Sequence, residues 1–424
     1  MLSVLAVASE CAGLVKTGGL ADVVAALPAA LAAHGVAVTT LLPGYPAVMQ
    51  AVGSARAARV MPDLFGGPAR IVPASVGGME LLALDAPHLF ARHGNPYQDA
   101  GGAEWGDNGV RFAALGAAAA FVAAGNLPGR KFSAVHAHDW QAGLAPAYLR
   151  FLKRPAPSLF TIHNLAFQGK FPAGLFGVLG LPPETFATAG LEYYGGVGFM
   201  KAALWFAGRL STVSPTYAAE IMTPQFGMGL DGLLRGRQAD LSGIVNGIDT
   251  AEWNPAADAH LEARFDAADP APRAANKTAL RRELGLAEES SGPLFAFVGR
   301  LTWQKGIDLI LESIPAIADS GGQLALVGSG ERGLEDRCRG AAAANPGRIG
   351  AFIGYSERLA RLCYGGADAV LVPSRFEPCG LAQLSALRYG ALPIVARTGG
   401  LADTVIDANA AAIAAGCGTG FVAA

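Results

Sequence analysis

The sequence carries little charge and few cysteines. Only 16% of its 424 residues are charged, and 32 basic against 34 acidic residues leave a net charge of -2. A chain without a basic excess lacks the charge that attracts a nucleic-acid backbone or an anionic membrane, so neither is expected as a partner. The five cysteines include no C-x-x-C pair. This argues against a disulfide framework or a zinc knuckle and predicts reduced thiols in a cytoplasmic protein.

Long apolar runs are also missing. The longest, residues 112–124, is alanine-rich and shorter than the roughly 18 to 20 residues that span a bilayer. It therefore predicts a buried helix. No basic segment precedes the apolar residues 2–8, so the start of the chain predicts a strand and not a secretory signal.

What the sequence does have is hydrophobic bulk in a regular alternation. Hydrophobic residues make up 52% of a chain that is longer than one core normally supports, so two domains are expected. Apolar spacing predicts a strand at 2–8, a helix over 20–31 closed by Gly35, and a strand at 36–42. Five more strands are predicted at 294–298, 323–327, 348–353, 369–373 and 392–396.

This alternation predicts an α/β protein with doubly wound parallel sheets. We expect a first domain over residues 1–245 and a second over 246–424. The polar, Pro- and Ala-rich residues 253–275 have the composition of a connector or a surface excursion.

A short internal repeat links the two halves: Lys16–Asp22 (KTGGLAD) recurs as Arg397–Asp403 (RTGGLAD). Each copy is predicted to follow a strand and to open a helix. A cation beside a Gly-Gly turn at a helix N-terminus suits an anion or a cluster of sugar hydroxyls. A tight turn would explain either copy alone, but both copies at matching places favour two half-sites in facing domains.

Two cations lie on the loop Gly299–Gly306 (GRLTWQKG), which follows a predicted strand and precedes a helix near Ile307. Open α/β sheets bind ligands at the carboxyl ends of their strands. Arg300 and Lys305 could therefore meet the developing negative charge of a diphosphate leaving group without a metal. The alternative is an exposed basic loop without a ligand.

The segment Ser374–Leu381 (SRFEPCGL) follows another predicted strand. Pro378 is suited to the first turn of the next helix, which would place Glu377 at the helix entrance facing the cleft. A carboxylate there can accept two sugar hydroxyls, or it can simply cap the helix. Cys379 is predicted to be a small buried packing residue and not a nucleophile.

Two weaker patterns point elsewhere. Gly328–Gly333 (GSGERG) matches the dinucleotide fingerprint and would fit an NAD-dependent oxidoreductase, but no acidic residue ends the next predicted strand near Tyr355. We interpret it as a generic phosphate-side or packing turn. His136 and His138 should point to one side of a strand, as in a metal site. Without further ligands at suitable spacing, a hydrogen-bonded histidine pair lining a cleft is favoured.

Six motifs together resemble the glycogen and bacterial-type starch synthases, in order and over essentially the whole chain. They are KTGGLADV from Lys16, VHAHDW from Val135, TIHNL from Thr161, VNGID from Val245, GRLTWQKG from Gly299 and SRFEPCGL from Ser374. The resemblance implies a GT-B fold of two Rossmann-like domains facing a deep cleft. It also implies glucose transfer from ADP-glucose to the non-reducing end of an α-1,4-glucan, with retention of configuration and without a cofactor or a metal.

The resemblance also assigns residues. It implies that Arg300 and Lys305 hold the donor diphosphate, that Glu377 binds the transferred glucose and that His163 lines the reacting face. The other substrate-binding residues it implies are Lys16, Gly18 and Gly19 near the diphosphate, Asp22 and Tyr97 on the glucan side, Asp139, Asn164 and Asn246 beside the sugar, Tyr355 on the nucleobase, Cys379, Gly380 and Leu381 in the Glu377 motif, and Thr398, Gly399 and Gly400 around phosphate and glucose.

Retention allows a double displacement, with Asp139 as the available nucleophile, or a front-side mechanism in which the leaving phosphate takes the acceptor proton; we favour the second. The sequence departs from the family in two places. Ser385 stands where many related retaining transferases have a second glutamate, and the family continues through further helices after the segment Gly418–Phe421. The alternative function is therefore a catalytically impaired GT-B glucan-binding protein. Oligomeric state is left open.

Overall fold

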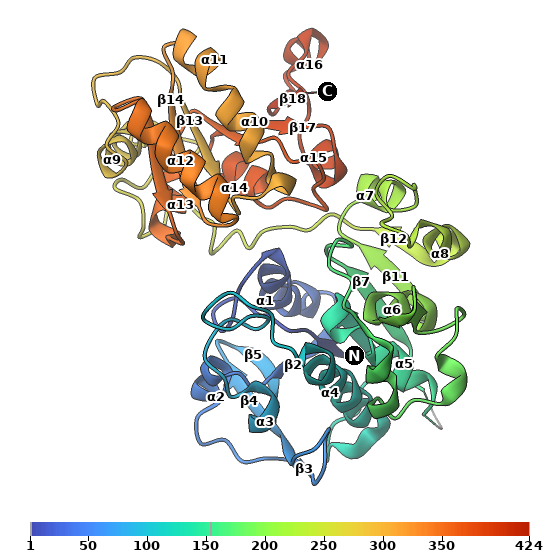
Figure 1. Ribbon diagram of the computed structural model, residues 1–424. Coiled ribbons are helices and arrows are strands. Elements are labelled where there is room, and N and C mark those ends of the chain that lie inside the picture. The colour runs from blue at the N-terminus through green and yellow to red at the C-terminus, as the bar shows by residue number, and fades with distance from the viewer. Residues whose placement is uncertain (1, 153–154, 424) are drawn as a thin grey trace. The chain divides into compact units, whose positions relative to one another are not determined.

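A computed structural model describes residues 2–152 and 155–423. They form two compact units, which run from blue to green and from yellow to red in Figure 1. Unit 1 extends to Val213 and includes Ala218–Ile244; unit 2 comprises Ser214–Tyr217 and the chain from Val245 onward. The short segment Ser214–Tyr217 belongs to unit 2 because the amide and hydroxyl of Thr216 donate to the carboxylate of Asp403, at 2.9 and 2.6 Å.

Unit 1 is built on a nine-stranded sheet in the order β12-β11-β7-β6-β1-β2-β5-β4-β3. The strands from β12 to β5 are parallel, as predicted for β1 and β2, and the β3–β4–β5 edge is antiparallel. The strands are β1 Leu2–Val7, β2 Val36–Pro43, β3 Arg59–Met61, β4 Ala69–Val76, β5 Met79–Asp85, β6 Ala134–His138, β7 Ser158–Ile162, β11 Arg209–Thr212 and β12 Leu241–Gly243. A separate small antiparallel sheet contains β8 Lys170–Pro172, β9 Glu192–Tyr193 and β10 Gly196–Gly198.

The helices of unit 1 connect these strands. They are α1 Gly19–Ala32, α2 Pro46–Val52, α3 Pro87–Phe90, α4 Asn108–Phe121, α5 Ala145–Arg150, α6 Phe199–Phe206 and α8 Asp231–Gly236. Helix α7 Pro215–Glu220 begins in the unit 2 segment and ends in unit 1. With the π turn Val122–Asn126, α4 is long and apolar enough to cross a membrane by length and composition, but 67% of that stretch is buried inside the protein. The predicted buried helix is confirmed, since Phe112 and Leu115 have no exposed surface.

Unit 2 is built on a six-stranded parallel sheet in the order β15-β14-β13-β16-β17-β18. The strands are β13 Leu294–Val298, β14 Gln323–Gly328, β15 Ile349–Ile353, β16 Ala369–Val372, β17 Leu392–Ala396 and β18 Phe421–Ala423. The five predicted strands are confirmed, two of them to the residue. Such strands are easy to recognise because a parallel sheet that is covered on both faces needs nearly continuous apolar runs.

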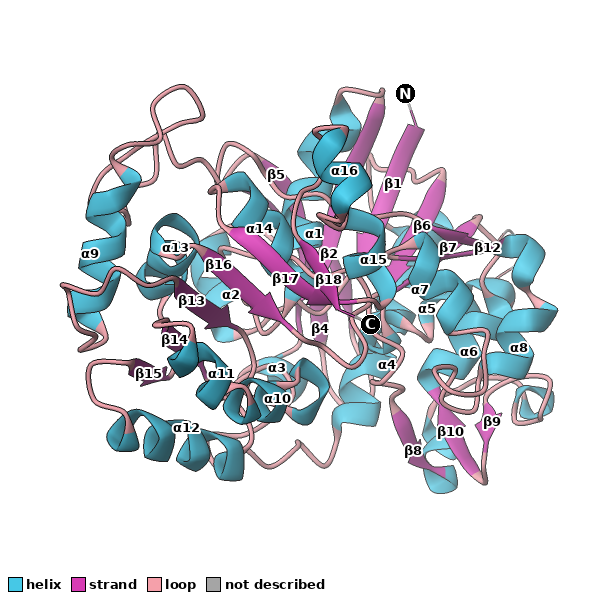
Figure 2. Ribbon diagram, turned by 90° about the horizontal axis from the view of Figure 1, so that it is seen from above, coloured by secondary structure: helices cyan, strands magenta, loops and turns pink. Residues whose placement is uncertain are grey.

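Helices cover both faces of this sheet, as Figure 2 shows. Alternation along β13 separates two cores: Leu294 and Ala296 join the core on one face, and Phe297 joins the core on the other. The helices are α9 Arg273–Glu283, α10 Ile307–Glu312, α11 Ile314–Asp319, α12 Arg332–Ala344, α13 Glu357–Gly366, α14 Ala382–Arg388, α15 Gly399–Thr404 and α16 Ala410–Ala414.

The predicted connector over residues 253–275 is partly wrong. Leu261 and Phe265 are buried in the core of unit 2, and Arg273 begins α9. The polar composition misled the prediction because only a few apolar side chains anchor the segment. Asp258 is also buried, where its carboxylate pairs with Arg361 Nη1 at 3.3 Å. The segment is therefore part of the unit 2 fold.

The glycines of the GSGERG turn serve packing. A Cβ at Gly328 would overlap the carbonyl oxygen of Gly299, and one at Gly330 would overlap that of Leu301. They let the turn after β14 approach the loop after β13, and the amide of Leu301 donates to Ser329 O at 2.9 Å. The interpretation as a packing turn is confirmed.

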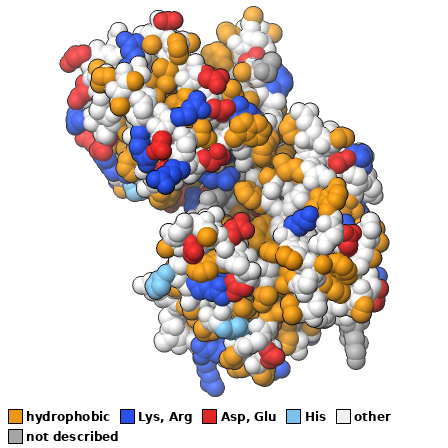
Figure 3. Space-filling view, viewed as in Figure 1, with side chains coloured by type: hydrophobic (Ala, Val, Ile, Leu, Met, Phe, Trp, Pro, Cys, Tyr) orange, Lys and Arg blue, Asp and Glu red, His pale blue; other side chains and the backbone are white. Residues whose placement is uncertain are grey.

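All five cysteines are unpaired, and four of them are buried. On the face in Figure 3, acidic and basic side chains are interspersed.

Candidate active site

Three loops of unit 2 meet at the carboxyl ends of the neighbouring strands β13, β16 and β17. The amide of Arg375 donates to Gln304 O at 2.9 Å, and Gln304 Nε2 donates to Phe376 O at 3.2 Å. The amide of Gly400 donates to Glu377 O at 3.1 Å. The sequence motifs GRLTWQKG, SRFEPCGL and RTGG thus form one cluster, at the edge where open α/β sheets bind ligands.

The carboxylate of Glu377 is the centre of this cluster. Its Oε2 accepts from Lys305 Nζ at 2.5 Å and from Ser374 Oγ at 2.9 Å. The side chain of Glu377 is 7% exposed and that of Lys305 is 21% exposed. Because a charge-assisted bond in a partly dry site is strong, Lys305 fixes the orientation of the carboxylate.

The predicted position of Glu377 at a helix entrance is wrong. Helix α14 begins only at Ala382, four residues after Pro378. In between, Gly380 has a φ of +75°, and Gln383 Nε2 donates to the carbonyl oxygens of Cys379 and Gly380 at 2.9 and 2.8 Å. A residue with positive φ cannot continue a helix, so the segment stays a loop. The positive charge that stabilises the Glu377 carboxylate therefore comes from Lys305 and not from a helix N-terminus.

Two arginines of the cluster differ in their surroundings. Arg300, as predicted, lies on the loop after β13; it is exposed, and its Nη2 donates to Gln304 Oε1 at 3.4 Å. Arg375, which the sequence analysis did not single out, makes two bonds of 2.8 Å to Asp308 and stacks 4.5 Å from the ring of Trp303. Hydrogen bonds from Arg375 hold the pKa of Asp308 below its usual value. Arg375 therefore joins the loops.

Cys379 and Gly400 are packed so closely in the cluster that a Cβ at Gly400 would overlap the carbonyl oxygen of Cys379. Burial raises the pKa of the Cys379 thiol to about 12, so it is protonated at neutral pH and is not a nucleophile, as predicted. The backbone N–H of Asn246 bonds to this thiol. Gly399 and Gly400 open α15 after Thr398, and Gly399 has a φ of +44°.

Gly400→Ala is expected to destabilise unit 2 by about 1 to 3 kcal/mol, because the added Cβ would overlap the backbone of Cys379. A lowered thermal midpoint and reduced turnover should both appear. Gly333→Ala is the control, since nothing lies within 4 Å of its Cβ position on α12. If Gly400→Ala melts with the wild-type midpoint, the packing described above is wrong.

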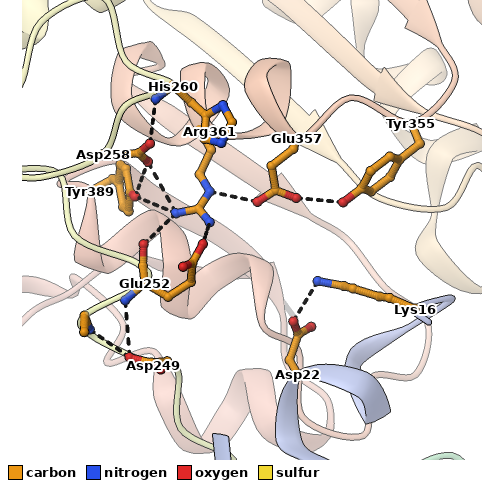
Figure 4. A network of polar contacts seen from close by, with 11 residues as sticks. Lys16, Asp22, Asp249, Glu252, Asp258, His260, Tyr355, Glu357, Arg361 and Tyr389 are labelled. Carbon is orange, nitrogen blue, oxygen red and sulfur yellow. Dashed lines mark hydrogen bonds and ion pairs between the residues drawn. The ribbon is translucent and has the colours of Figure 1, made fainter. Parts of the chain in front are cut away.

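Tyr355 lies at the edge of a second polar network in unit 2 (Figure 4). Its ring is 77% exposed, and its hydroxyl donates to Glu357 Oε2 at 2.7 Å. The other oxygen of Glu357 accepts from Arg361 Nε at 2.9 Å. Arg361 is buried, also bonds Asp258, and stacks 3.8 Å from the ring of Trp253. The exposed ring is therefore tied to a buried charge.

In unit 1, the loop that leads from β1 to the first copy of the repeat is longer than predicted. Residues 8–18 separate β1 from α1, so this copy does not directly follow its strand, whereas the second follows β17 at once. Gly18 is the N-cap and Gly19 opens α1, one position later than in the second copy. Lys16 Nζ pairs with Asp22 Oδ1 at 2.7 Å, as Figure 4 shows.

Glu10 holds this loop, and the sequence analysis missed it. Its buried carboxylate accepts from the amide and hydroxyl of Thr17, at 2.5 and 2.6 Å, and from the amide of Gly18 at 3.2 Å. The hydroxyl of Tyr97 also donates to Glu10 and lies 2.8 Å from Ser9 Oγ. Burial, then the charge of Glu10, raises the pKa of Tyr97. Tyr97 therefore supports the Gly-Gly loop from the side.

Three histidines of unit 1 lie together: His138 and His163 are buried, and His136 is partly buried. His136 and His138 lie on the same side of β6, with ring centroids 3.9 Å apart, as alternation predicted. They are not bonded to each other. His136 Nε2 lies 2.6 Å from Thr161 Oγ1, and His138 Nδ1 lies 3.0 Å from His163 Nε2. In residues 2–152 and 155–423, no three His, Cys, Asp or Glu side chains are grouped to hold a metal ion.

Asp139 positions the end of β7. Its Oδ1 accepts from the amides of His163 and Asn164, at 2.7 and 3.3 Å, and its own φ is +54°. Burial raises the pKa of Asp139 to about 7 and lowers the pKa of His163 to about 3. Such a strained, buried carboxylate is typical of a functional site.

Comparisons with known proteins show the family to which the chain belongs. Residues 3–236 match the model of the starch synthase catalytic domain, and residues 277–422 match that of glycosyl transferases group 1. The chain is 56% identical over 420 residues to a glycogen synthase of Rhodopseudomonas palustris, covering 99% of this chain and 86% of that protein. It is 58% identical over 405 residues to glycogen synthase 2 of Bradyrhizobium diazoefficiens, covering 95% and 84%.

A solved structure of the catalytic domain of starch synthase IV from Arabidopsis thaliana, bound to ADP and acarbose, matches with a TM-score of 0.87 at 33% identity, covering 99% of this chain and 88% of that one. Sucrose-phosphate synthase from Thermosynechococcus elongatus, at 19% identity, has a TM-score of 0.58 over 96% and 84% of the two chains, and shares the fold. The chain has the GT-B architecture of two Rossmann-like units and belongs to the glycogen and starch synthase family of glycosyltransferases.

Proposed function

We propose that the protein transfers glucose from ADP-glucose to the non-reducing end of an α-1,4-glucan, with retention of configuration. The observation that carries this proposal is the Lys305–Glu377–Ser374 cluster at the carboxyl ends of β13 and β16. In a chain 56% identical to a glycogen synthase, this cluster supplies what sugar transfer needs: a fixed cation and an oriented carboxylate.

Unit 2 binds the donor in this proposal. Lys305 and Arg300 meet the negative charge that builds up on the departing diphosphate, which is usually the largest single contribution to such catalysis. Glu377, held by Lys305, accepts hydroxyls of the transferred glucose. The amides at the start of α15, near Thr398, bind phosphate oxygens. No metal or cofactor is required for these steps.

Unit 1 binds the acceptor, through the loop that contains His163 and Asn164. Asp139 is unsuited to act as a nucleophile, because its Oδ1 already accepts two backbone N–H groups and its pKa is raised to about 7 by burial. This supports the front-side route, in which a phosphate oxygen of the leaving group takes the acceptor proton. Asp139 then acts by positioning His163. The reduced thiols suit a cytoplasmic location, which we also propose.

Incubation of purified protein with ADP-glucose and maltotriose tests the function. We expect release of one ADP for each glucose added, and a product that an α-1,4-specific exoglucosidase shortens again. UDP-glucose in place of ADP-glucose tests the donor. Binding of maltotriose without ADP release would instead support the alternative, a glucan-binding protein without catalysis.

Glu357 is expected to act on the donor only through Tyr355. If the Tyr355 ring stacks on the nucleobase, Tyr355→Phe and Glu357→Ala should each raise the KM for ADP-glucose about three- to tenfold, because each removes the 2.7 Å bond that orients the ring. The double variant should show no further increase. The KM for glucan should stay unchanged. Additive effects in the double variant would mean that Glu357 acts independently of Tyr355.

A further inference from the structure

A strained tyrosine stands on the surface of unit 1. Tyr194 and Gly195 join β9 to β10, and both have positive φ, +47° and +74°. This is the backbone of a two-residue type I′ hairpin turn, where Asn-Gly is the preferred pair. Among the described residues, only four other than glycine have positive φ: Phe65, Asp139, Tyr194 and Met228.

Tyr194 and Met228, two of these four, belong to one structure. The Cβ position of Gly229 lies 3.2 Å from the hydroxyl of Tyr194 and 2.8 Å from that of Tyr193. The hydroxyl of Tyr193 donates to Met228 O at 3.0 Å. Strain of this kind persists where the surrounding structure imposes it, and it concentrates at functional sites. Asp139, near His163, is an example in the same unit.

Folding alone does not account for a tyrosine at this position. Its ring is 72% exposed, so little buried area offsets the strained backbone. The ring is nevertheless held in place: it packs edge-on against Tyr193 at 4.7 Å, and Lys170 Nζ lies 5.4 Å from its centroid. Glu192 ties the turn by accepting from the amide of Gly195 at 2.8 Å. An oriented aromatic face is thus presented to solvent.

We call Tyr194, with its neighbours Tyr193 and Lys170, the Tyr194 platform. It is connected to the loop that contains His163 and Asn164. Gln168 follows four residues after Asn164, and its Nε2 donates to Met228 O at 3.1 Å. Lys170, beside the Tyr194 ring, begins β8 only two residues later. The same segment therefore runs from the proposed acceptor loop to the platform.

We propose that the Tyr194 platform is an outer subsite for the α-glucan acceptor. A pyranose ring has an apolar face of C–H groups, which packs on an aromatic ring, and hydroxyls at its edge, which can accept from the Lys170 ammonium. One exposed ring with a polar neighbour fits such a ligand better than a protein partner, which needs a larger apolar area. The subsite deepens the proposed function and rests on it for the identity of the glucan.

Tyr194→Asn separates ligand binding from folding. Asparagine suits the left-handed turn, so the variant should melt at or above the wild-type midpoint. The Kd for maltoheptaose, measured calorimetrically without donor, should rise about five- to tenfold, whereas Tyr194→Trp should retain affinity. In the transferase assay, the KM for glycogen should rise while the KM for ADP-glucose stays the same.

Phe65→Asn is the matched control, because Phe65 is also an aromatic residue at positive φ before a glycine. It should leave the Kd for maltoheptaose unchanged. Wild-type affinity in Tyr194→Asn, equal losses in both variants, unfolding of Tyr194→Asn, or no maltoheptaose binding by the wild type would each overturn the subsite. Because binding is measured without ADP-glucose, a protein that binds through Tyr194 but transfers no glucose would refute only the proposed function.

Discussion

Lys305→Ala is expected to lower kcat about a hundredfold, equivalent to about 3 kcal/mol of lost transition-state stabilisation. Lys305 lies on the loop after β13 and brings the cation nearest to the buried Glu377 carboxylate. Without it, the leaving diphosphate loses a fixed positive charge, and Glu377 loses the group that orients it. Steady-state ADP release at saturating ADP-glucose measures the effect. Unchanged turnover would remove Lys305 from the mechanism.

The same change is expected to destabilise unit 2, because breaking a buried ion pair leaves an unpaired carboxylate at a cost of about 3 kcal/mol. Lys305→Ala combined with Glu377→Gln should recover the thermal midpoint but not the turnover. Arg339→Ala is the control, since its pairs with Glu335 and Asp336 lie on the surface and its side chain is 52% exposed. Recovery of turnover in the double variant would show that Lys305 serves only to neutralise Glu377.

The sequence predicted the fold where structure follows from local pattern. Strands β13 and β17 were located to the residue because both faces of a parallel sheet need apolar side chains. In unit 1 the sequence analysis located only β1 and β2 by their bounds; it did not delimit the longer strands β4, β5, β7 and β11, and it missed β3, β12 and the small β8–β10 sheet. The shortest of these strands are defined by their partners in space, because propensity over two or three residues carries too little information.

The site residues likewise divide into those that local sequence pattern predicted and those that depend on partners distant in the sequence. The loops with Arg300, Lys305 and Glu377 were predicted because a strand, a turn and a charge follow each other in the sequence. Glu10 and Arg361 were missed because their partners are distant: Glu10 and Tyr97 are 87 residues apart, and Arg361 and Asp258 are 103. Only the spacing of Glu357 and Arg361, four residues apart on α13, was a signal that could have been read.

The alternation of the sequence places His136 and His138 on one side of a strand, but their burial is a property of the fold. This burial leads to the second prediction with a large expected effect, the pH dependence of stability. Acidification is expected to destabilise unit 1 by about 2 to 3 kcal/mol for each pH unit between about 5.5 and 4. Burial lowers the pKa of His136 to about 4 and of His163 to about 3, and moves that of His138 well below its usual value. In this pH range the three histidines are therefore protonated in the unfolded chain but remain largely neutral in the folded unit.

Asp139 opposes this effect. Burial raises its pKa to about 7, so between its ordinary value of 3.8 and 7 the folded unit keeps a proton that the unfolded chain has lost. The difference is two protons, each worth about 1.4 kcal/mol per pH unit. Stability consequently rises with pH through this range, and the slope falls toward zero near pH 7, where the unfolded histidines have lost most of their protons and the folded Asp139 is losing its own.

Urea unfolding at a series of pH values from 4.5 to 7.5 measures this slope. His136→Gln should roughly halve it by removing one of the three titrating rings, and Asp139→Asn should steepen it by removing the opposing proton. His34→Gln, at an exposed position, should leave it unchanged. The opposite signs of the first two variants separate burial of the histidines from general acid sensitivity. A wild-type slope in His136→Gln would mean that this ring takes up its proton in the folded unit as readily as in the unfolded chain.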